Sequence, residues 1–389
     1  MTALEAPNQS IQSPVSDAKL HGETGIMETL DNLLHDCEQA AGIAIPPDLE
    51  QQLAVGSEGR QEEAAAYSFE KHFTNEVKDL DLVQVGLLLR RMPCLRQLRL
   101  AFAFCPRLDD STLIALGAGL STALTRLSLS FEHCERTGDS GLEGLALRLP
   151  AGLQQLELAF SDCQDVGDGG LAALGVCLPT SLVALDLRFN GCKRLGDWGL
   201  ETLAEGLPAT LEVLRLDFAR CGQLSDMAAT ALARRLPGGL RDLSLSLDHC
   251  NKVSDTGLTV LSEALPQGLT RLALSFAFCE KVGDVGVASL GTHLPAALRE
   301  MSLSVTGCNA VDNPSLPSLA AGLPEGLQKL HLNFEGCFRV EQAALLELLT
   351  SAPDTIGVWS LNFKHCGNIK PLPDGGQSRD SLLRWLQAV

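Results

Sequence analysis

The sequence predicts an α/β solenoid, in which short parallel strands alternate with helices and successive units stack side by side. Each unit has a strand-like half with alternating leucines and a helix-like half that ends in proline. A curved horseshoe follows, with parallel strands on the concave face and helices on the convex face. The clearest sign is a cysteine that recurs every 29 residues, a period typical of stacked repeats. It stands at Cys105, Cys134, Cys163, Cys192, Cys221, Cys250, Cys279, Cys308, Cys337 and Cys366.

Two segments are predicted before the repeats begin. Residues 1–22 contain few large apolar side chains and predict a disordered tail. Residues 23–93 predict an acidic helical cap region that covers the first unit of the stack. Within it, residues 62–73 predict a helix, and residues 79–93 resemble the helical half of a repeat without a preceding strand.

Residues 94–372 predict the solenoid itself, with about ten strands. Leu127, Leu129 and Phe131 alternate with small or polar residues, which is the period of a strand with one buried face. In the following half, Asp139 predicts a helix cap and Pro150 a helix end. Equivalent aspartates are Asp110, Asp168, Asp197, Asp226, Asp255 and Asp284, and equivalent prolines are Pro179, Pro208, Pro237, Pro266, Pro295, Pro324 and Pro353.

The last units depart from this pattern. Pro314 and Pro317 stand where a helix should begin, so we expect a shorter or irregular helix there. Trp359 replaces a core leucine. Residues 373–389 predict a C-terminal capping helix that covers the final strand with four apolar side chains. They are Leu382, Leu383, Trp385 and Leu386.

Charge and composition restrict the classes of partner. The net charge is −18, and residues 1–93 contain 16 acidic against 6 basic residues. Such a chain repels phosphate and anionic lipid, so we expect neither nucleic acid nor a membrane as partner, whereas a basic protein remains possible. No apolar run reaches membrane-spanning length and the N-terminus does not resemble a secretory signal. We expect a monomer in the cytoplasm or nucleus, with reduced thiols.

The repeat resembles the leucine-rich repeat family. Leu-x-x-Leu-x-Leu is followed by Cys-x-x-Val/Leu-x-Asp-x-Gly-Leu, as in Cys163–Leu171 and Cys250–Leu258, which is similar to the cysteine-containing subclass. An extra phenylalanine precedes the cysteine, and the longer helix resembles the ribonuclease-inhibitor-like subclass. The extra residues are Phe102, Phe131, Phe160, Phe189, Phe218, Phe276, Phe334 and Phe363.

The resemblance implies a noncatalytic intracellular scaffold that binds a protein with its concave face and N-terminal region. An alternative is a substrate-receptor subunit of a ubiquitin ligase, although residues 23–93 show no convincing F-box. A regulator of a small GTPase is a further alternative, but no residue points to it. An enzyme is not expected, because no nucleophile, acid–base or phosphate-binding arrangement is apparent.

The repeated cysteines, aspartates and histidines predict neither a cofactor nor a metal site. A straight row of cysteines lacks the tetrahedral clustering that zinc needs, so we expect buried thiols that pack as small apolar groups. Each aspartate stands alone in its unit, which favours helix caps over calcium ligands. His133, His249 and His365 share one place in the repeat, but at least four units separate each from the next.

The outward strand positions predict where a partner binds. Three concave rows begin at Arg99, Ala101 and Ala103 and continue every 29 residues. In the middle units they concentrate charge, which makes a candidate protein-binding patch. Its opposite charges, Asp186 with Arg215 and Arg188 with Asp217, lie on adjacent strands and could instead neutralise each other. The patch consists of Glu157, Asp186, Arg188, Arg215 and Asp217, and Phe104, Phe278 and the N-terminal region are further candidate contacts.

Overall fold

The computed structural model describes residues 67–73, 89, 94–367, 369 and 378–387. They belong to the second of two compact units, which begins at Glu62. Predictions for residues 1–22, for most of 23–93 and for part of 373–389 therefore lie outside the described residues. Among the helices that the structure describes, none combines the length and apolarity needed to cross a membrane.

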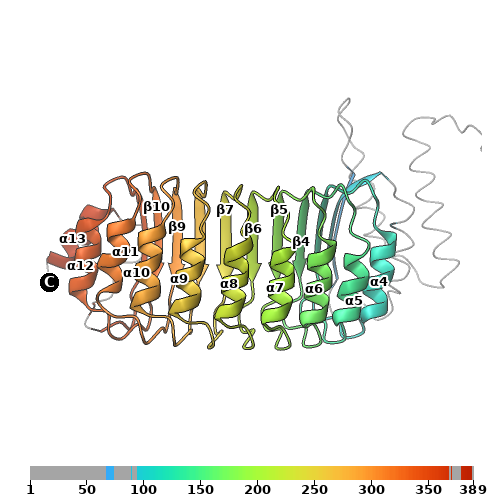
Figure 1. Ribbon diagram of the computed structural model, residues 1–389, viewed down its shortest axis with the longest axis horizontal. Helices are drawn as coiled ribbons and strands as arrows, with labels where there is room; N and C mark the ends of the chain where they lie inside the picture. Colours follow the sequence, from blue (N-terminus) through green and yellow to red (C-terminus); the bar gives the residue numbers. More distant parts are fainter. Residues whose placement is uncertain (1–66, 74–88, 90–93, 368, 370–377, 388–389) are drawn as a thin grey trace, which may run out of the picture. The chain divides into compact units, whose positions relative to one another are not determined.

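The described strands form one open parallel sheet of eleven strands in chain order, β1 to β11 (Figure 1). This arrangement confirms the predicted parallel sheet, and strands β2 to β11 belong to the 29-residue units. The strands are β1 (Tyr67–Phe73), β2 (Leu95–Phe102), β3 (Arg126–Ser130), β4 (Gln155–Ala159), β5 (Ala184–Arg188), β6 (Val213–Asp217), β7 (Asp242–Ser246), β8 (Arg271–Ser275), β9 (Glu300–Ser304), β10 (Lys329–Asn333) and β11 (Val358–Asn362).

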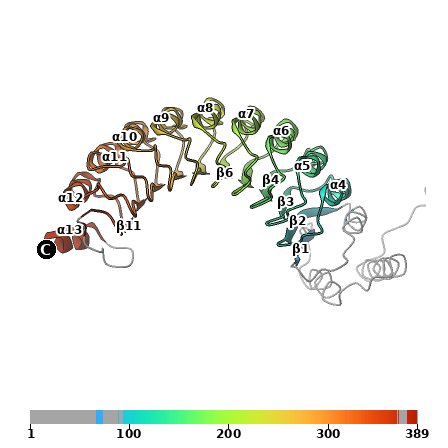
Figure 2. The ribbon, with the colours of Figure 1, turned by 90° about the horizontal axis from the view of Figure 1, so that it is seen from below.

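One helix follows each strand from β2 to β10, and these helices line the outer side of the arc while the strands line its inner side (Figure 2). The solenoid prediction is therefore confirmed. We call each strand with its following helix a rung. The helices are α4 (Asp110–Gly119), α5 (Asp139–Ala146), α6 (Asp168–Cys177), α7 (Asp197–Glu205), α8 (Asp226–Arg235), α9 (Asp255–Glu263), α10 (Asp284–His293), α11 (Ser315–Gly322), α12 (Gln342–Ser351) and α13 (Arg379–Gln387).

The helix predicted over residues 62–73 is wrong where the structure describes it, because β1 occupies Tyr67–Phe73. This strand pairs in parallel with β2, with a register shift between Tyr67 and Ser68. When β1 pairs with the otherwise open edge of the sheet at β2, its backbone N–H and C=O groups form hydrogen bonds. Local helix propensity does not take these bonds into account. The prediction that residues 79–93 lack a preceding strand is wrong for the same reason. Of those residues, only Leu89 is described, and it is helical and buried.

Apolar side chains of every rung meet in one continuous interior. Leu156, Leu158 and Phe160 of one rung are buried beside the equivalent residues of the rungs on either side. The extra phenylalanines stack on one another, with ring centroids 5.1 Å apart for Phe131 and Phe160 and 5.5 Å apart for Phe160 and Phe189. The stack runs from Phe102 to Phe218 and resumes at Phe334 and Phe363, with buried Leu247 and Val305 on either side of Phe276, so removing a rung would expose its two neighbours.

The repeated cysteines are free thiols, and those from Cys134 to Cys366 are buried, as predicted. Each buried thiol lies near a carbonyl of the preceding rung. Cys163 Sγ, for example, donates to the Phe131 carbonyl at 3.1 Å, and Cys192 Sγ to the Phe160 carbonyl at 3.1 Å. Desolvation raises the pKa of the Cys134 thiol to about 12. These cysteines therefore stay protonated, and they join successive rungs as packing groups.

The repeated aspartates do not cap their own helices, so that prediction is wrong. Helix α6 begins at Asp168, and its N-cap is Gly167. Instead, Asp139 Oδ1 accepts from the Gly167 backbone N–H of the next rung at 2.7 Å, and Asp226 Oδ1 accepts from Ser254 N at 2.7 Å. A carboxylate in the first helical turn can satisfy an orphan donor of the neighbouring helix start. The aspartates therefore link one rung to the next instead of capping their own helices.

A glycine two residues after the aspartate makes room for this bond. A Cβ on Gly199 would lie 2.6 Å from Asp168 Oδ1, and one on Gly257 would lie 2.7 Å from Asp226 Oδ1. The Gly257 backbone N–H also donates to that carboxylate at 3.1 Å. The Asp-x-Gly spacing is thus explained by contact between rungs. The carboxylate of one rung approaches the backbone of the next rung at the glycine.

The last rungs keep these contacts with different residues. Asn313 takes the place of the aspartate, and its Oδ1 accepts from Glu341 N at 2.7 Å. Helix α11 starts only at Ser315, after Pro314, so its delayed start agrees with the prediction. Trp359 is buried, as expected for a residue that replaces a core leucine.

The C-terminal helix α13 packs beside α12 at the end of the array (Figure 2). Leu382 and Leu386 are buried, and Leu383 and Trp385 pack against the core. Arg379 donates to the carbonyls of Leu349 and Thr350, which end α12 without helical partners. A helix is therefore present over Arg379–Gln387, but it packs beside the last repeat helix, whereas the sequence placed it over the final strand.

Neighbouring helices come into backbone contact at two places on the convex side. A Cβ on Gly206 would collide with the carbonyl of Gly175, and a Cβ on Gly322 would collide with that of Gly291. Gly175 and Gly291 lie in the last turn of α6 and α10, Gly206 directly follows α7, and Gly322 ends α11. Only residues without a side chain allow the helix ends to approach so closely.

Candidate protein-binding surface

The concave face presents side chains in straight rows, because the strands pair without slipping from β2 to β11. Arg99 pairs with Ser128, Ser128 with Glu157, and Glu157 with Asp186, and the register continues in the same way along the sheet. Leucines at the intervening positions are buried, so alternate side chains face away from the core. The two rows that begin at Arg99 and Ala101 are therefore rows in the structure, whereas the third, which begins at Ala103, lies just beyond the strand ends.

The centre of the predicted patch is an arginine held by two carboxylates. Arg188 Nη2 lies 3.0 Å from Glu157 Oε1 and 3.1 Å from Asp186 Oδ2, with 43% of the arginine side chain exposed. Partial desolvation lowers the pKa of Arg188, but the two carboxylates outweigh it and raise that pKa. Ser128 Oγ donates to Glu157 at 2.9 Å. These residues come together as an ordered cluster in which one arginine faces two carboxylates.

Arg215 and Asp217 do not join that cluster, and the two pairs considered from the sequence, Asp186 with Arg215 and Arg188 with Asp217, are replaced by other partners. Arg215 Nη2 instead contacts Asp242 Oδ2 at 2.8 Å. Asp217 accepts from Asn190 Nδ2 at 3.1 Å and from Ala219 N at 3.0 Å. Long side chains can reach diagonal neighbours as easily as direct ones, so register alone does not decide the partner.

A fourth concave row was missed by the sequence analysis. It lies two residues before the first row, so continuing the same period-two alternation backwards would have found it. The row runs Gln97, Arg126, Gln155, Ala184, Val213, Asp242, Arg271, Glu300, Lys329 and Val358.

Part of this fourth row forms a chain of opposite charges over β7 to β10. Arg271 lies 3.6 Å from Asp242 and 3.7 Å from Glu300. Lys329 Nζ donates to Glu300 Oε1 at 2.7 Å, and this bond holds the pKa of Glu300 below its usual range. The acidic groups of these strands are therefore already engaged by basic neighbours.

A shallow hollow of about 470 Å³ lies on the concave face over β2 to β6. Arg99 and Arg126 stand at one end, and Arg215 stands at the other. Glu157 and Asp186 lie between them, and both carboxylates contact Arg188. The hollow is thus lined by polar and charged side chains together with leucines, an alanine and a valine of the sheet, which suits recognition of a mixed polar and apolar protein surface.

A second distinctive surface lies where the strands end, and we call it the strand-exit rim. One residue of each rung adopts a left-handed conformation there, and from Phe104 to Gly336 its N–H donates to a carbonyl of the next rung, as Phe104 N does to Glu132 O at 3.0 Å. The rim residues are Phe104, His133, Asp162, Gly191, Arg220, His249, Phe278, Gly307, Gly336 and His365.

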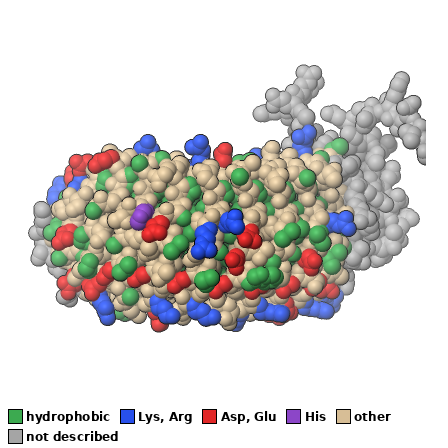
Figure 3. Space-filling view, in the orientation of Figure 1, with side chains coloured by type: hydrophobic (Ala, Val, Ile, Leu, Met, Phe, Trp, Pro, Cys, Tyr) green, Lys and Arg blue, Asp and Glu red, His purple; other side chains and the backbone are tan. Residues whose placement is uncertain are grey.

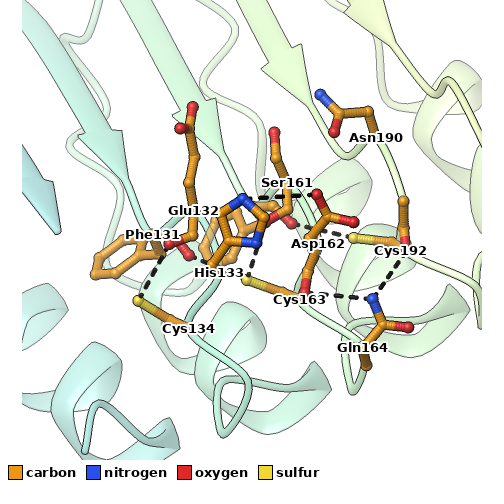
Figure 4. A network of polar contacts seen from close by, with 12 residues as sticks. Phe131, Glu132, His133, Cys134, Ser161, Asp162, Cys163, Gln164, Asn190 and Cys192 are labelled. Carbon is orange, nitrogen blue, oxygen red and sulfur yellow. Dashed lines mark hydrogen bonds and ion pairs between the residues drawn. The ribbon is translucent and has the colours of Figure 1, made fainter. Parts of the chain in front are cut away.

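Polar and aromatic contacts join neighbouring rim residues. His133 Nε2 lies 3.7 Å from Asp162 Oδ2, and Figure 4 shows this ring and carboxylate close together. Gln164 Nε2 donates to the carbonyls of Asp162 and Gly191 at 3.3 and 3.2 Å. Phe104 stacks on His133, and Phe278 stacks on His249, so the histidines contact rim neighbours rather than one another.

The helical face is mixed in character. In Figure 3 acidic and basic side chains lie along its lower edge, with separate apolar side chains between and above them. Leu147 and Val176 occupy equivalent exposed positions on neighbouring rungs, as do Trp198 and Met227. Within the described part of the chain, no cluster of three or more His, Cys, Asp or Glu side chains could hold a metal ion.

Comparison with known proteins gives likeness of fold only. No family model and no curated protein matches the chain. The leucine-rich repeat-containing protein LegL7 from Legionella pneumophila has 16% identity and a TM-score of 0.46, over 75% of this chain and 90% of that chain. The complex of Rad7 and Elc1 in yeast has 16% identity and a TM-score of 0.42, over 92% and 97%. These values carry no argument about function.

The arrangement of the described strands and helices is enough to assign the fold. Strands pair in parallel in chain order, each followed by one helix on the same side of the sheet, and both halves recur every 29 residues. The leucines, phenylalanines and cysteines of the period face the shared interior. The described chain is a leucine-rich-repeat solenoid.

Proposed function

We propose that the protein is a noncatalytic scaffold that binds a protein partner through the concave face of the solenoid. The observation that carries the proposal is the hollow over β2 to β6, where charged side chains of several strands converge on an open surface. Rigid strands hold these side chains at fixed spacings, so little ordering entropy is lost when a partner binds.

The arginines of the hollow are the side chains we expect to matter most. Arg99, Arg126 and Arg215 line it, and arginine is enriched among residues that dominate binding energy. Arg126 carries an exposed guanidinium beside Gln97 and Gln155 in the fourth row. Together these groups present planar donors that match carboxylate and carbonyl groups of a protein.

The test is proximity labelling in the native cell with wild-type protein and two variants. Arg188→Ala combined with Arg215→Ala removes both arginines of the charged patch, and we expect partners to be lost. Arg194→Ala is the matched control, because Arg194 is equally basic but pairs with Asp165 outside the strands. An unchanged set of partners in the double variant, with an unchanged melting temperature, would rule out this patch as the contact surface.

A further inference from the structure

We propose that the strand-exit rim carries two aromatic clamps that bind basic side chains of a protein partner. The first clamp is Phe104 stacked on His133, and the second is His249 stacked on Phe278. The proposal rests on the proposed function in one respect, namely that the partner is a protein. It concerns a different surface from the concave hollow, so the two can fail separately.

Backbone strain at the rim is the first argument. Phe104, His133, His249 and Phe278 have φ between 56° and 59°, in the left-handed region. That conformation costs a side-chain-bearing residue about 1–2 kcal/mol, and glycine escapes the cost. Other rungs do place glycine at this position, so the fold accepts it. Residues that keep strained aromatic side chains there stabilise the fold less than glycine would, which points to a use outside the fold.

Exposure is the second argument. The ring centroids lie 4.3 Å apart in the first clamp and 4.5 Å apart in the second, with the planes nearly parallel. Phe104 is nevertheless 54% exposed and Phe278 is 45% exposed. Each phenylalanine therefore contacts its neighbouring imidazole while much of its surface remains open to solvent. Phe278 also lies close to Gly307 of the next rung, where an added Cβ would be 2.7 Å from the ring, and its ring still remains about half exposed.

Charge identifies the ligand. In the first clamp, Asp162 lies 3.7 Å from the His133 ring, and Glu132 directly precedes that histidine. In the second, Asp248 Oδ1 accepts from Ala277 N at 2.7 Å, immediately before Phe278. An aromatic face beside a carboxylate attracts a guanidinium or ammonium group through both cation–π and ionic contacts. Each clamp therefore suits an arginine or a lysine.

The spacing of the clamps sets the partner's geometry. Five rungs separate the centre of the first pair from that of the second, and parallel strands lie about 4.8 Å apart, so the clamps are about 24 Å apart. An extended peptide spans this distance with about seven residues. Arg220 occupies the rim position directly before His249, on the side that faces the first clamp, and repels a cation there. The fitting segment thus carries two basic residues about seven positions apart, with no basic residue between them.

The probe for the test is a fluorescein-labelled peptide with two arginines seven positions apart and neutral residues between, assayed by fluorescence anisotropy at low salt. Phe104→Gly combined with Phe278→Gly removes both rings and leaves the residue that other rungs use. We expect at least about tenfold weaker binding than in the wild type, because two cation–π contacts are lost. Arg220→Gly is the matched control at an equivalent backbone position, and it should bind as tightly or more tightly.

Three outcomes overturn the proposal. They are unchanged binding in the double glycine variant, equal binding of a peptide with glutamates in place of the arginines, and equal loss of binding in the Arg220→Gly control. Circular dichroism confirms that each variant is folded. If native partners depend on Arg188 and Arg215 but the double glycine variant binds the probe like the wild type, the concave function stands and the clamps are excluded.

Discussion

The interior and the outward rows of the solenoid obey different rules, although both repeat every 29 residues. Phe160 has its counterpart at the same buried place in most rungs, and Cys163 has one in every rung from Cys105 to Cys366. The rim, by contrast, holds phenylalanine, histidine, aspartate, arginine or glycine at a single repeat position. Packing between rungs demands uniform side chains, whereas an outward position tolerates variety. Specific recognition therefore depends on the positions at which the rungs differ.

The largest effect that we expect from the uniform interior is a loss of stability at alkaline pH. The ordinary thiol pKa is 9.0, and burial raises it to about 12 in Cys134 and in Cys221. Between these values the unfolded chain ionises and the folded chain does not, so stability falls as pH rises above 9. Each such thiol contributes about 1.4 kcal/mol per pH unit. We expect a steep loss of melting temperature from pH 8.5 to 10.5.

A matched variant attributes that loss to the thiols. Cys192→Ala removes one buried thiol whose pKa is raised by burial, and it should make the pH dependence of the unfolding free energy shallower by about one proton. An identical slope in the variant and the wild type would show that other groups cause the alkaline unfolding.

Replacing one phenylalanine of the interior and one of the strand-exit rim tests how much each contributes to packing. Phe160→Ala leaves a cavity between two stacked rings, and we expect a loss of about 3–5 kcal/mol in the free energy of unfolding. Phe104→Ala removes a half-exposed ring and should cost about 1 kcal/mol or less. Urea denaturation measures both. Similar losses in the two variants would contradict the distinction between interior and rim.

The aspartate row gives an intermediate effect. Asp226 accepts from Ser254 N, Ser254 Oγ and Gly257 N, at 2.7, 2.6 and 3.1 Å. Asp226→Ala should therefore lower the free energy of unfolding by about 2–3 kcal/mol, since donors of the next rung lose a charged acceptor. Asp165→Ala is the control, because this exposed carboxylate pairs only at the surface with Arg194. Equal losses of unfolding free energy in the two variants would mean that the hydrogen bonds between rungs contribute no more than a surface ion pair.

The smallest predicted effect is a gain in stability instead of a loss. Arg220→Gly relieves a left-handed backbone at an exposed residue, so we expect the free energy of unfolding to rise by up to about 1 kcal/mol. A higher melting temperature in calorimetry would support the claim that rim side chains are held against local strain. A clear destabilisation would remove the strain argument for the clamps.

The sequence predicted the interior well because burial imposes a pattern that one chain displays by itself. Leu98, Leu100 and Phe102 alternate, and only one face of a strand can take them into the core. The Asp139 interaction could not be read in this way. Its side chain bonds a backbone group 28 residues further along the chain, whereas cap rules consider only the residue's own helix.

The candidate surface was predicted less completely, for related reasons. Period-two alternation placed Arg188 and Arg215 on the concave face, but their ion-pair partners depend on side-chain reach, which register does not supply. The strand β1 was missed because its pairing edge is created by β2, outside the local window. The left-handed backbone at Phe104 left no signal, because phenylalanine is a poor predictor of that conformation.

The glycine contacts between helices have a geometric consequence for the arc. The bend of a solenoid reflects how much wider its helical side is than its strand side. Where Gly206 meets Gly175 and Gly322 meets Gly291, no side chain separates the two helix backbones, so the wide side is as narrow there as backbone contact allows. A single methyl group at Gly206 would wedge two helices apart and tighten the bend. Replacing these glycines would thus change the distance between the two ends of the concave face without touching a residue that faces a partner.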